Sequence, residues 1–143
     1  VRSHGGATCR HVPQAPTQGA HNLVLHPSGQ TTSVDELCAG MKKGLLVLGG
    51  YSRADHQALN AQSGGDLVYE VVDGKMGSVV EGAVFITRAP EFWKNVSRIG
   101  GVETVQSVGL DRWRSPGIFA HTVSAPAALV KNVAVTTDIQ RTL

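Results

Sequence analysis

The sequence contains six histidines, two cysteines and eleven carboxylates, but few of them are spaced for catalysis or metal binding. A helical zinc-hydrolase motif puts two His on one face of a helix, with a Glu near enough to act as general base. No pair of histidines in this chain has that arrangement. Cys9 and His11 are the nearest pair of metal-binding residue types, but side chains two residues apart on an extended chain point to opposite sides. We therefore interpret them as loop residues and predict no metal site made by this chain alone.

The sequence also lacks a recognisable set of residues for nucleophilic catalysis. Ser, His and Asp are all present, but the G-x-S-x-G turn that exposes a nucleophilic serine is missing. The Gly49-Gly50 pair is not followed by the Gly-Lys-Ser/Thr end of a phosphate-binding loop. A hydrolase that uses Asp55, His56 and Ser63 from one polar segment stays open as a third hypothesis.

A β-hairpin is predicted around Asp73-Gly74, between the apolar runs Leu67–Val72 and Lys75–Ile86. Asp-Gly accepts the positive φ angles of a type I′ turn. A two-residue loop pairs, in order from the turn, Val72 with Lys75, Val71 with Met76, Tyr69 with Ser78 and Leu67 with Val80. The face that we expect to be buried then carries Leu67, Tyr69, Val71, Met76 and Val80.

The first predicted helix covers Val34–Lys43. Ser33 and Glu36 form the capping box of its first turn. Lys42 and Lys43 are expected in the last turn, where they would complement the helix dipole, and Gly44 is expected to end the helix.

A second helix is predicted over Pro90–Ile99. Pro90 suits the first helical position, and Gly100-Gly101 is expected to supply the left-handed C-terminal end. The apolar stripe of Phe92, Trp93, Val96 and Ile99 is interpreted as core rather than as a ligand site.

The chain as a whole is predicted to be a single β-rich α+β domain, residues 1–143, that begins with an extended lead-in over residues 1–20. Strands are expected at Asn22–His26, Leu45–Leu48, Leu67–Val72, Lys75–Ile86, Ile118–Ser124 and Leu129–Val135. They would form an antiparallel or mixed sheet, curved or barrel-like, with two short helices. The segments Gly49–Asp66 and Leu110–Gly117 are predicted to be loops.

Composition excludes several classes of function. The net charge is only +2 and no basic run is present, which argues against nucleic acid as a main partner. No apolar run approaches the roughly 18 residues of a membrane span, and no signal-peptide pattern opens the chain. Cys9 and Cys38 could pair, but Cys38 falls on the apolar face of the first helix. We therefore favour unpaired thiols and a cytoplasmic location.

Five short motifs follow one another along the chain. They are Ser3–Arg10, Asn22–Gly29, Ser33–Val47, Glu91-Phe92-Trp93 with Gly100-Gly101, and Ala125–Thr136. In this order they resemble the C-terminal domain of the TldD/PmbA family, whose members are metalloprotease-related and were once labelled modulators of DNA gyrase. The chain begins with Val1, which, with this resemblance, leads us to expect a fragment or a processed chain.

The resemblance implies zinc chemistry in the family but not in this chain. TldD-type members bind zinc through an H-E-x-x-x-H helix in their N-terminal half and a Cys in the C-terminal domain. Here Asp111 stands at the place of that Cys, which makes it a weak candidate ligand. The implied partners are a TldD/TldE-like subunit or a missing N-terminal half.

The implied function is a peptide-cleft-forming domain of a zinc protease system that is itself non-catalytic. The two predicted loops lie where the cleft-lining segments of the family lie, so the candidate peptide-binding residues are Gly49, Gly50, Asn60, Ser63, Gly64, Asp66 and Trp113. The alternative is a non-enzymatic assembly or binding domain with a degenerate TldD-like fold.

Overall fold

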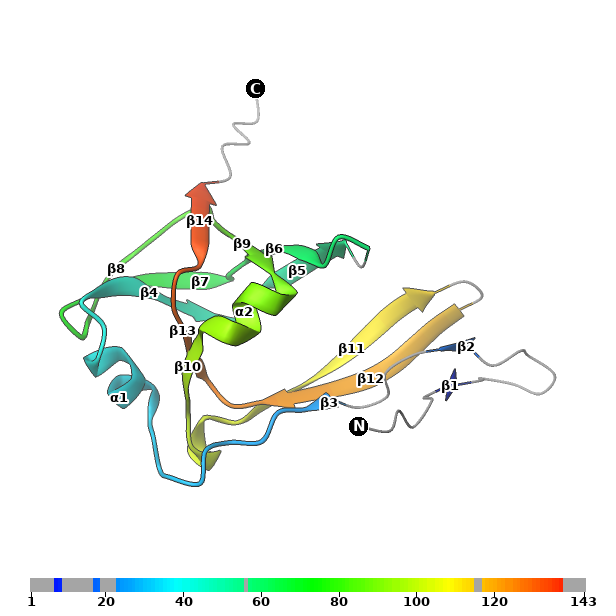
Figure 1. The fold of residues 1–143 in the computed structure, drawn as a ribbon, viewed down its shortest axis with the longest axis horizontal. Coiled ribbons are helices and arrows are strands. Elements are labelled where there is room, and N and C mark those ends of the chain that lie inside the picture. Colours follow the sequence, from blue (N-terminus) through cyan, green and yellow to red (C-terminus); the bar gives the residue numbers. More distant parts are fainter. Residues whose placement is uncertain (1–6, 9–16, 19–22, 56, 115–116, 138–143) are drawn as a thin grey trace.

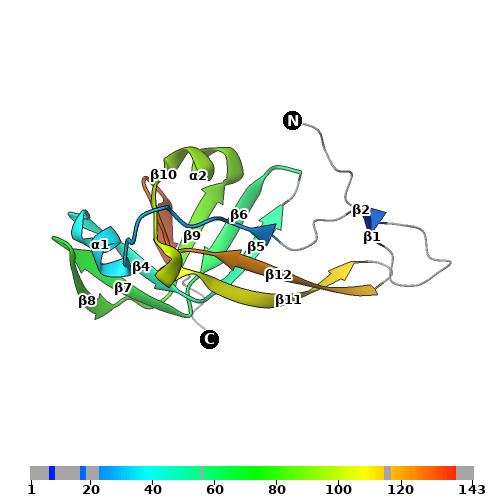
Figure 2. The ribbon, with the colours of Figure 1, turned by 90° about the horizontal axis from the view of Figure 1, so that it is seen from below.

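A computed structural model describes residues 7–8, 17–18, 23–55, 57–114 and 117–137 (Figures 1 and 2). The helices of these ranges are α1 (Val34–Ala39), α2 (Ala89–Asn95) and a short 3₁₀ helix over Val102–Thr104. The strands are β1 (Ala7–Thr8), β2 (Thr17–Gln18), β3 (Leu23–Val24), β4 (Lys43–Leu48), β5 (Tyr51–Asp55), β6 (Asn60–Gly64), β7 (Leu67–Val72), β8 (Lys75–Val79), β9 (Ala83–Arg88), β10 (Val96–Ile99), β11 (Gln106–Arg114), β12 (Gly117–Ala125), β13 (Ala128–Val130) and β14 (Ala134–Thr137).

The body of the molecule is built on one long, bent hairpin. β4 continues into β5 through Gly49-Gly50, and β6 continues into β7 through Gly65-Asp66. The pairs before the bend, from Lys43 with Val72 to Leu48 with Leu67, have the same register as the pairs after it, from Tyr51 with Gly64 to Asp55 with Asn60. The two halves are therefore one antiparallel ribbon that bends where glycines allow it.

A third strand follows the same ribbon on its other side. β8 pairs with β7 and β9 pairs with β6, and the Val80 N–H donates to the Val68 carbonyl at 2.8 Å between them. β14 extends this sheet along the far side of β9. The prediction of a curved, strand-rich α+β fold is confirmed. The described strands form several open sheets, and none of these closes into a barrel. The parallel pairing of β3 with β12 makes the fold mixed.

The Asp73-Gly74 turn forms as predicted, with φ of 47° and 75°. Two backbone hydrogen bonds of 2.8 Å, to the carbonyls of Met41 and Lys42, tie the turn to the segment between α1 and β4. The register next to the turn is confirmed, but a bulge at Gly77-Ser78 then shifts it by one residue.

The bulge changes which residues share a face. Tyr69 pairs with Val79 instead of Ser78, so Val79 replaces Val80 on the face that we expected to be buried. The burial prediction is also wrong for most of this face: Val71 is fully buried, but Leu67 is 37% exposed and Met76 60% exposed. The alternation of apolar residues correctly predicted the strands, but within the described residues few elements cover this face.

Both helices are shorter than predicted. The capping box of α1 is confirmed, with Ser33 Oγ accepting from the Glu36 N–H at 3.2 Å. The expected last turn is wrong, because Lys43 already starts β4 and Lys42 uses its carbonyl for the hairpin turn. Long-range pairing with β7 outweighs the local helical signal.

The end of the second helix is also wrong. Residues Val96–Ile99 form β10, which pairs with β13, and they do not continue α2. β-Branched residues at 96 and 99 fit a strand at least as well as a helix. Gly100 therefore does not end a helix, and its N–H donates instead to the Ala127 carbonyl at 2.8 Å.

Both predicted loops contain strands. The described residues of Gly49–Asp66 are the far half of the long hairpin. The described residues of Leu110–Gly117 belong to the β11–β12 pairing, which continues to Arg114 opposite Gly117. Polar residues and glycines were misread as loop signals, although strand pairing satisfies their backbone groups equally well. Three strand predictions also need correction. Among the described residues of Asn22–His26, only Leu23–Val24 is strand. Lys75–Ile86 is divided into β8 and β9 by residues 80–82, and Leu129–Val135 is divided near Asn132, where φ is 55°.

In the predicted lead-in, β1 pairs with β2, and the remainder of residues 1–20 lies outside the described residues. No helix in the described part of the chain is both long and apolar enough to cross a membrane.

The glycine bend yields a first prediction. Gly50 has φ of 124°, and a Cβ at this position would collide with the carbonyl of Gly64. Gly50→Ala should therefore lower the free energy of unfolding by about 2 to 4 kcal/mol, measured by urea denaturation. Gly29→Ala is the matched control, because a Cβ there meets nothing within 4 Å. Equal stability of the two variants would contradict the proposed strain at the bend.

Candidate functional site

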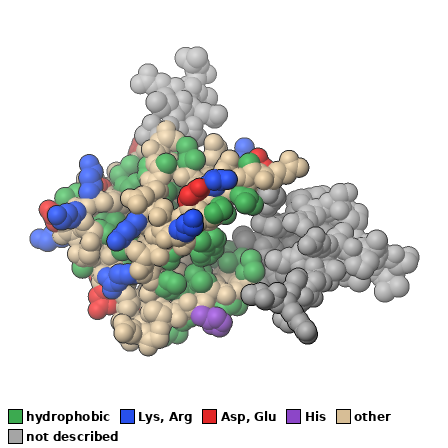
Figure 3. Space-filling model, viewed as in Figure 1, with side chains coloured by type: hydrophobic (Ala, Val, Ile, Leu, Met, Phe, Trp, Pro, Cys, Tyr) green, Lys and Arg blue, Asp and Glu red, His purple; other side chains and the backbone are tan. Residues whose placement is uncertain are grey.

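Two cavities stand out among the described residues, and the larger of the two has a volume of about 1250 Å³. One side is the outer edge of β4, and the floor is one face of β5, β6 and β9. Residues of α1, α2 and β13 form the remaining walls. Figure 3 shows hydrophobic side chains exposed between α2 and the β11–β12 hairpin. The cavity thus lies where separate elements of the fold meet.

Small side chains form the floor of this cavity. The strand register puts Ser52 beside Ser63 and Ala54 beside Ala61. On β9, Thr87 completes the second row, and Phe85 completes the first row as the one large side chain of these two rows. The Ser63 hydroxyl donates to the Ser52 hydroxyl at 3.1 Å. Because the small residues of these rows hardly project from the sheet, the space above them stays open.

The edge of β4 offers backbone hydrogen-bonding groups to the cavity. Within the described residues, β4 pairs with β7 on one side only, and every residue of Lys43–Leu48 lines the cavity. A strand of six residues is about 20 Å long. Unpaired N–H and C=O groups on such an edge can bind an extended peptide as an added strand.

The walls are largely apolar. They include Leu37 and Cys38 of α1, Leu129 of β13, and Phe92 and Trp93 of α2. The interpretation of the α2 aromatics as a core stripe is wrong for Trp93, whose side chain is 60% exposed. Phe92 is half-buried, and neighbouring residues of a helix project about 100° apart, so Trp93 points further outward than Phe92.

Three of the predicted peptide-binding residues line the cavity: Gly49, Asn60 and Ser63. The other candidates of the first predicted loop, Gly50, Gly64 and Asp66, meet at the bend instead, where Asp66 approaches Gly49 and the Gly64 carbonyl approaches Gly50. The bend therefore places these residues beside the cavity. The close approach of the main chains there explains why glycine is found at positions 50 and 64.

Trp113 and Asp111 lie on β11, opposite Ile118 and Ala120, and their side chains are outside the described part of the structure. Cys9, His11 and His56 also lie outside the described residues. Of the alternative hydrolase residues, Asp55 and Ser63 line the cavity. Asp55 Oδ1 accepts from the backbone N–H groups of Gln57 and Ala58, at 2.9 and 3.2 Å, and so closes the β5–β6 turn.

Sequence reasoning missed the β4 edge and the α1 and α2 walls. The run Leu45–Leu48 was predicted as a strand, but its apolar residues carry no sign that it would lie at a sheet edge. The adjacent Phe92-Trp93 pair was a usable signal, since neighbouring helical residues project about 100° apart and one of the two lies nearer the margin of the apolar face.

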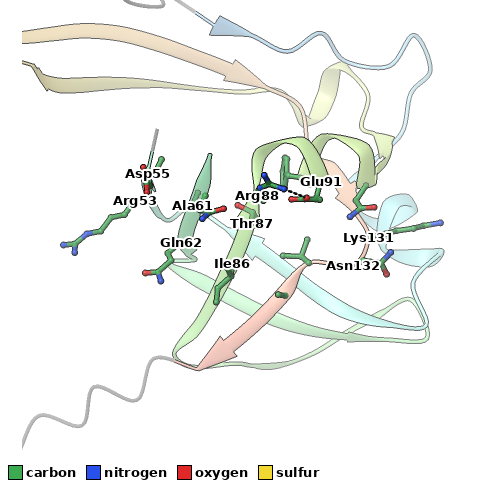
Figure 4. A pocket seen from close by; sticks show the side chains of 16 residues that line it. Arg53, Asp55, Ala61, Gln62, Ile86, Thr87, Arg88, Glu91, Lys131 and Asn132 are labelled. Carbon is green, nitrogen blue, oxygen red and sulfur yellow. Dashed lines mark hydrogen bonds and ion pairs between the residues drawn. The ribbon is translucent and has the colours of Figure 1, made fainter. Parts of the chain in front are cut away.

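A smaller cavity of about 660 Å³ is lined partly by residues of the opposite face of the β5–β6–β9 sheet (Figure 4). Its carboxylate Glu91 is paired with Arg88 at 2.9 Å. Arg53 and Lys131 point away from the cavity in Figure 4. These charges do not converge on one point, so this cavity offers no catalytic arrangement.

Cys38 is a free, buried thiol in the wall of the larger cavity. Burial raises the pKa of the Cys38 thiol above its ordinary value, and the negative charge of Asp35 raises it further. The thiol is therefore held in its neutral form, which is a poor nucleophile and a poor metal ligand.

The donor set of the described chain does not fit a catalytic metal. No three His, Cys, Asp or Glu side chains of the described residues come together in a group that could hold an ion. We therefore derive no reaction step through a metal on this chain.

Comparison with known proteins agrees with this fold. A family model described as the PmbA/TldA metallopeptidase C-terminal domain matches residues 2–137. A proposed modulator of a DNA gyrase from Thermotoga maritima MSB8 has a similar structure, with a TM-score of 0.62 and 19% sequence identity over 80% of this chain. TldE from Thermococcus kodakarensis gives a TM-score of 0.61 and 17% identity over 89% of this chain.

The chain covers 24% and 26% of those two proteins, so it spans about a quarter of their length. At these identities the likeness concerns the fold alone. No curated protein matches the sequence.

The buried thiol gives a second prediction. In a Cys9→Ser background, Cys38 should react with a maleimide at least about tenfold more slowly in the folded chain than in urea. Because the folded pKa is raised, the contribution of Cys38 to the free energy of unfolding should be constant below about pH 8.5 and fall as the pH rises further. Asp35→Asn should speed the reaction only modestly, because burial is the larger cause. Equal rates in folded and unfolded chains would show that Cys38 is accessible.

Proposed function

The chain belongs to the PmbA/TldA metallopeptidase C-terminal domain family, and from this premise we propose that it forms one wall of a peptide-binding cleft. In this proposal the chain holds an extended peptide but does not cut it. The family assignment agrees with the TldD/PmbA resemblance of the five motifs.

One observation carries the proposal. The free edge of β4 lies along a cavity of about 1250 Å³ whose walls are apolar and whose floor is made of small side chains. An edge supplies backbone hydrogen bonds that do not depend on the peptide sequence, and the cavity supplies room for side chains. Gly49, Asn60 and Ser63 take part as lining residues, which supports the peptide-contact role predicted for them.

The catalytic groups would come from other polypeptide. The resemblance implies zinc held by an H-E-x-x-x-H helix, and this chain has no such sequence. We propose that a TldD/TldE-like subunit, or an N-terminal half of the same protein, provides the metal site beside this wall. The free thiol of Cys38 fits the reducing cytoplasm.

A second candidate function is a non-enzymatic assembly domain. It is favoured by the many large apolar residues that are exposed, among them Leu23, Val24, Val79 and Val108. In that case a protein partner, and not a peptide, would cover these surfaces.

Activity in the presence of a partner provides the main test. The chain alone should not hydrolyse peptides. Mixed with a TldD-type subunit that bears H-E-x-x-x-H, it should co-elute and support cleavage that chelators abolish. Ala54→Phe should reduce that cleavage at least about tenfold, because an aromatic ring on the floor fills the space of the peptide.

The matched control is Ala134→Phe, which adds the same ring to the opposite face of the same sheet. It should leave cleavage within about twofold of the unchanged chain. Cleavage by the chain alone that resists chelators, or no association with the subunit, would show that the role is wrong.

Metal content provides an independent test. We expect the purified chain to contain far less than one zinc ion per molecule, because no set of three or four N or S ligands is recognisable in its sequence. Elemental analysis measures this directly. Stoichiometric zinc that is lost in Cys9→Ala or Asp111→Ala would contradict the expectation and would restore Asp111 as a ligand.

A further inference from the structure

Trp93 stands out among the residues that line the larger cavity. Its side chain is 60% exposed, although it belongs to a helix in the middle of the chain. Its ring meets that of Phe92 edge to face, with ring centroids 5.4 Å apart. An aromatic pair that lines an open cavity has apolar surface still uncovered, and covering it would be favourable.

The helix that carries this pair is firmly held at both ends. At its start, the Ala89 N–H donates to the Leu59 carbonyl at 2.8 Å, and Arg88 pairs with Glu91 at 2.9 Å. At its end, the Lys131 N–H donates to the Asn95 carbonyl at 2.9 Å. The two rings are therefore presented by a fixed support, so little conformational entropy would be lost when a ligand covers them.

We propose that Phe92 and Trp93 form an aromatic subsite that takes one bulky apolar side chain of the peptide lying along the edge of β4. The inference rests on the proposed function and adds a side-chain preference to it. The substrate class is then extended peptides that carry an aromatic or large aliphatic residue, rather than peptides of any composition.

The geometry of an added strand explains why one position would matter. Successive side chains of an extended peptide point to opposite sides, and every second one recurs on the same side after about 6.6 Å. Along the β4 edge, one of these two sets faces the apolar walls of the cavity. A single large residue of that set can reach the aromatic pair, while backbone hydrogen bonds to β4 fix its distance along the strand.

The test measures binding of a dye-labelled six-residue peptide to the full chain by fluorescence anisotropy. Peptides with Phe at one position, moved in turn along the sequence, are compared with the corresponding Ser peptides. At one position, the Phe peptide should bind at least about tenfold more tightly than the corresponding Ser peptide. At the positions two residues before and after it, the difference between Phe and Ser should be smaller. Trp93→Ala should remove this preference, and Trp93→Phe should keep most of it.

The matched control is Met76→Ala. Met76 is also 60% exposed, but it lies on β8 and does not line the cavity. Its removal should leave the affinity and the Phe preference unchanged. Circular dichroism of each variant checks that the fold is kept, since Trp93 is exposed and its removal should cost little stability.

Three outcomes separate this inference from the proposed function. If the Ser and Phe peptides bind equally well, but methylation of the peptide N–H groups abolishes binding, the aromatic subsite is wrong and the β4 edge survives. If methylation has no effect, the proposed function itself fails. If Trp93→Ala prevents association with a TldD-type subunit while peptide binding is unchanged, the aromatic pair belongs to a protein interface and the inference is overturned.

Discussion

The close approach of main chains at the Gly49-Gly50 bend is the constraint on which the rest of this structure depends. At this point the backbone of Gly50 faces the carbonyl of Gly64, and Asp66 packs against Gly49, which leaves no room for a Cβ. A continuous hairpin can therefore bend without losing its register. The bend puts the edge of β4 and the face of β5 and β6 around one space, which is why the cavity exists.

The open cavity is accompanied by a small buried core. On β5 and β6 the floor carries Ser and Ala where a compact sheet would carry Val or Ile. Among the described residues, only Leu37, Cys38, Val68, Val71 and Ala83 form the buried apolar core. Fifteen large apolar residues of the described chain are exposed instead. A domain with so little buried apolar surface gains stability from whatever covers the rest. In our proposal, a bound peptide and a partner polypeptide would therefore both stabilise the folded chain.

Many of the polar groups that could be mistaken for catalytic ones serve the fold. Asp55 closes a turn, Ser33 and Glu36 cap α1, and Arg98 donates to the Glu36 carbonyl at 3.0 Å and so fixes α1 to β10. Besides these groups, the cavity is lined by backbone edges, hydroxyl groups, apolar walls and the charged residues Lys43, Glu103 and Lys131. In our proposal this surface binds and orients an extended chain, and the groups that cleave the chain come from another polypeptide.

The sequence by itself determined the features that depend on neighbouring residues. The Asp73-Gly74 turn, the capping box at Ser33, the bounds of β7 and the family could all be recognised, because short-range backbone preferences and motif order decide them. Tertiary structure decided where α1 and α2 end, that the two supposed loops are strands, and that Trp93 is exposed. Each of these depends on a pairing partner far along the chain, such as β7 for Lys43 or β13 for Val96. The cavity belongs to this second group, since its floor, edge and walls come from segments that only the folded bend brings together.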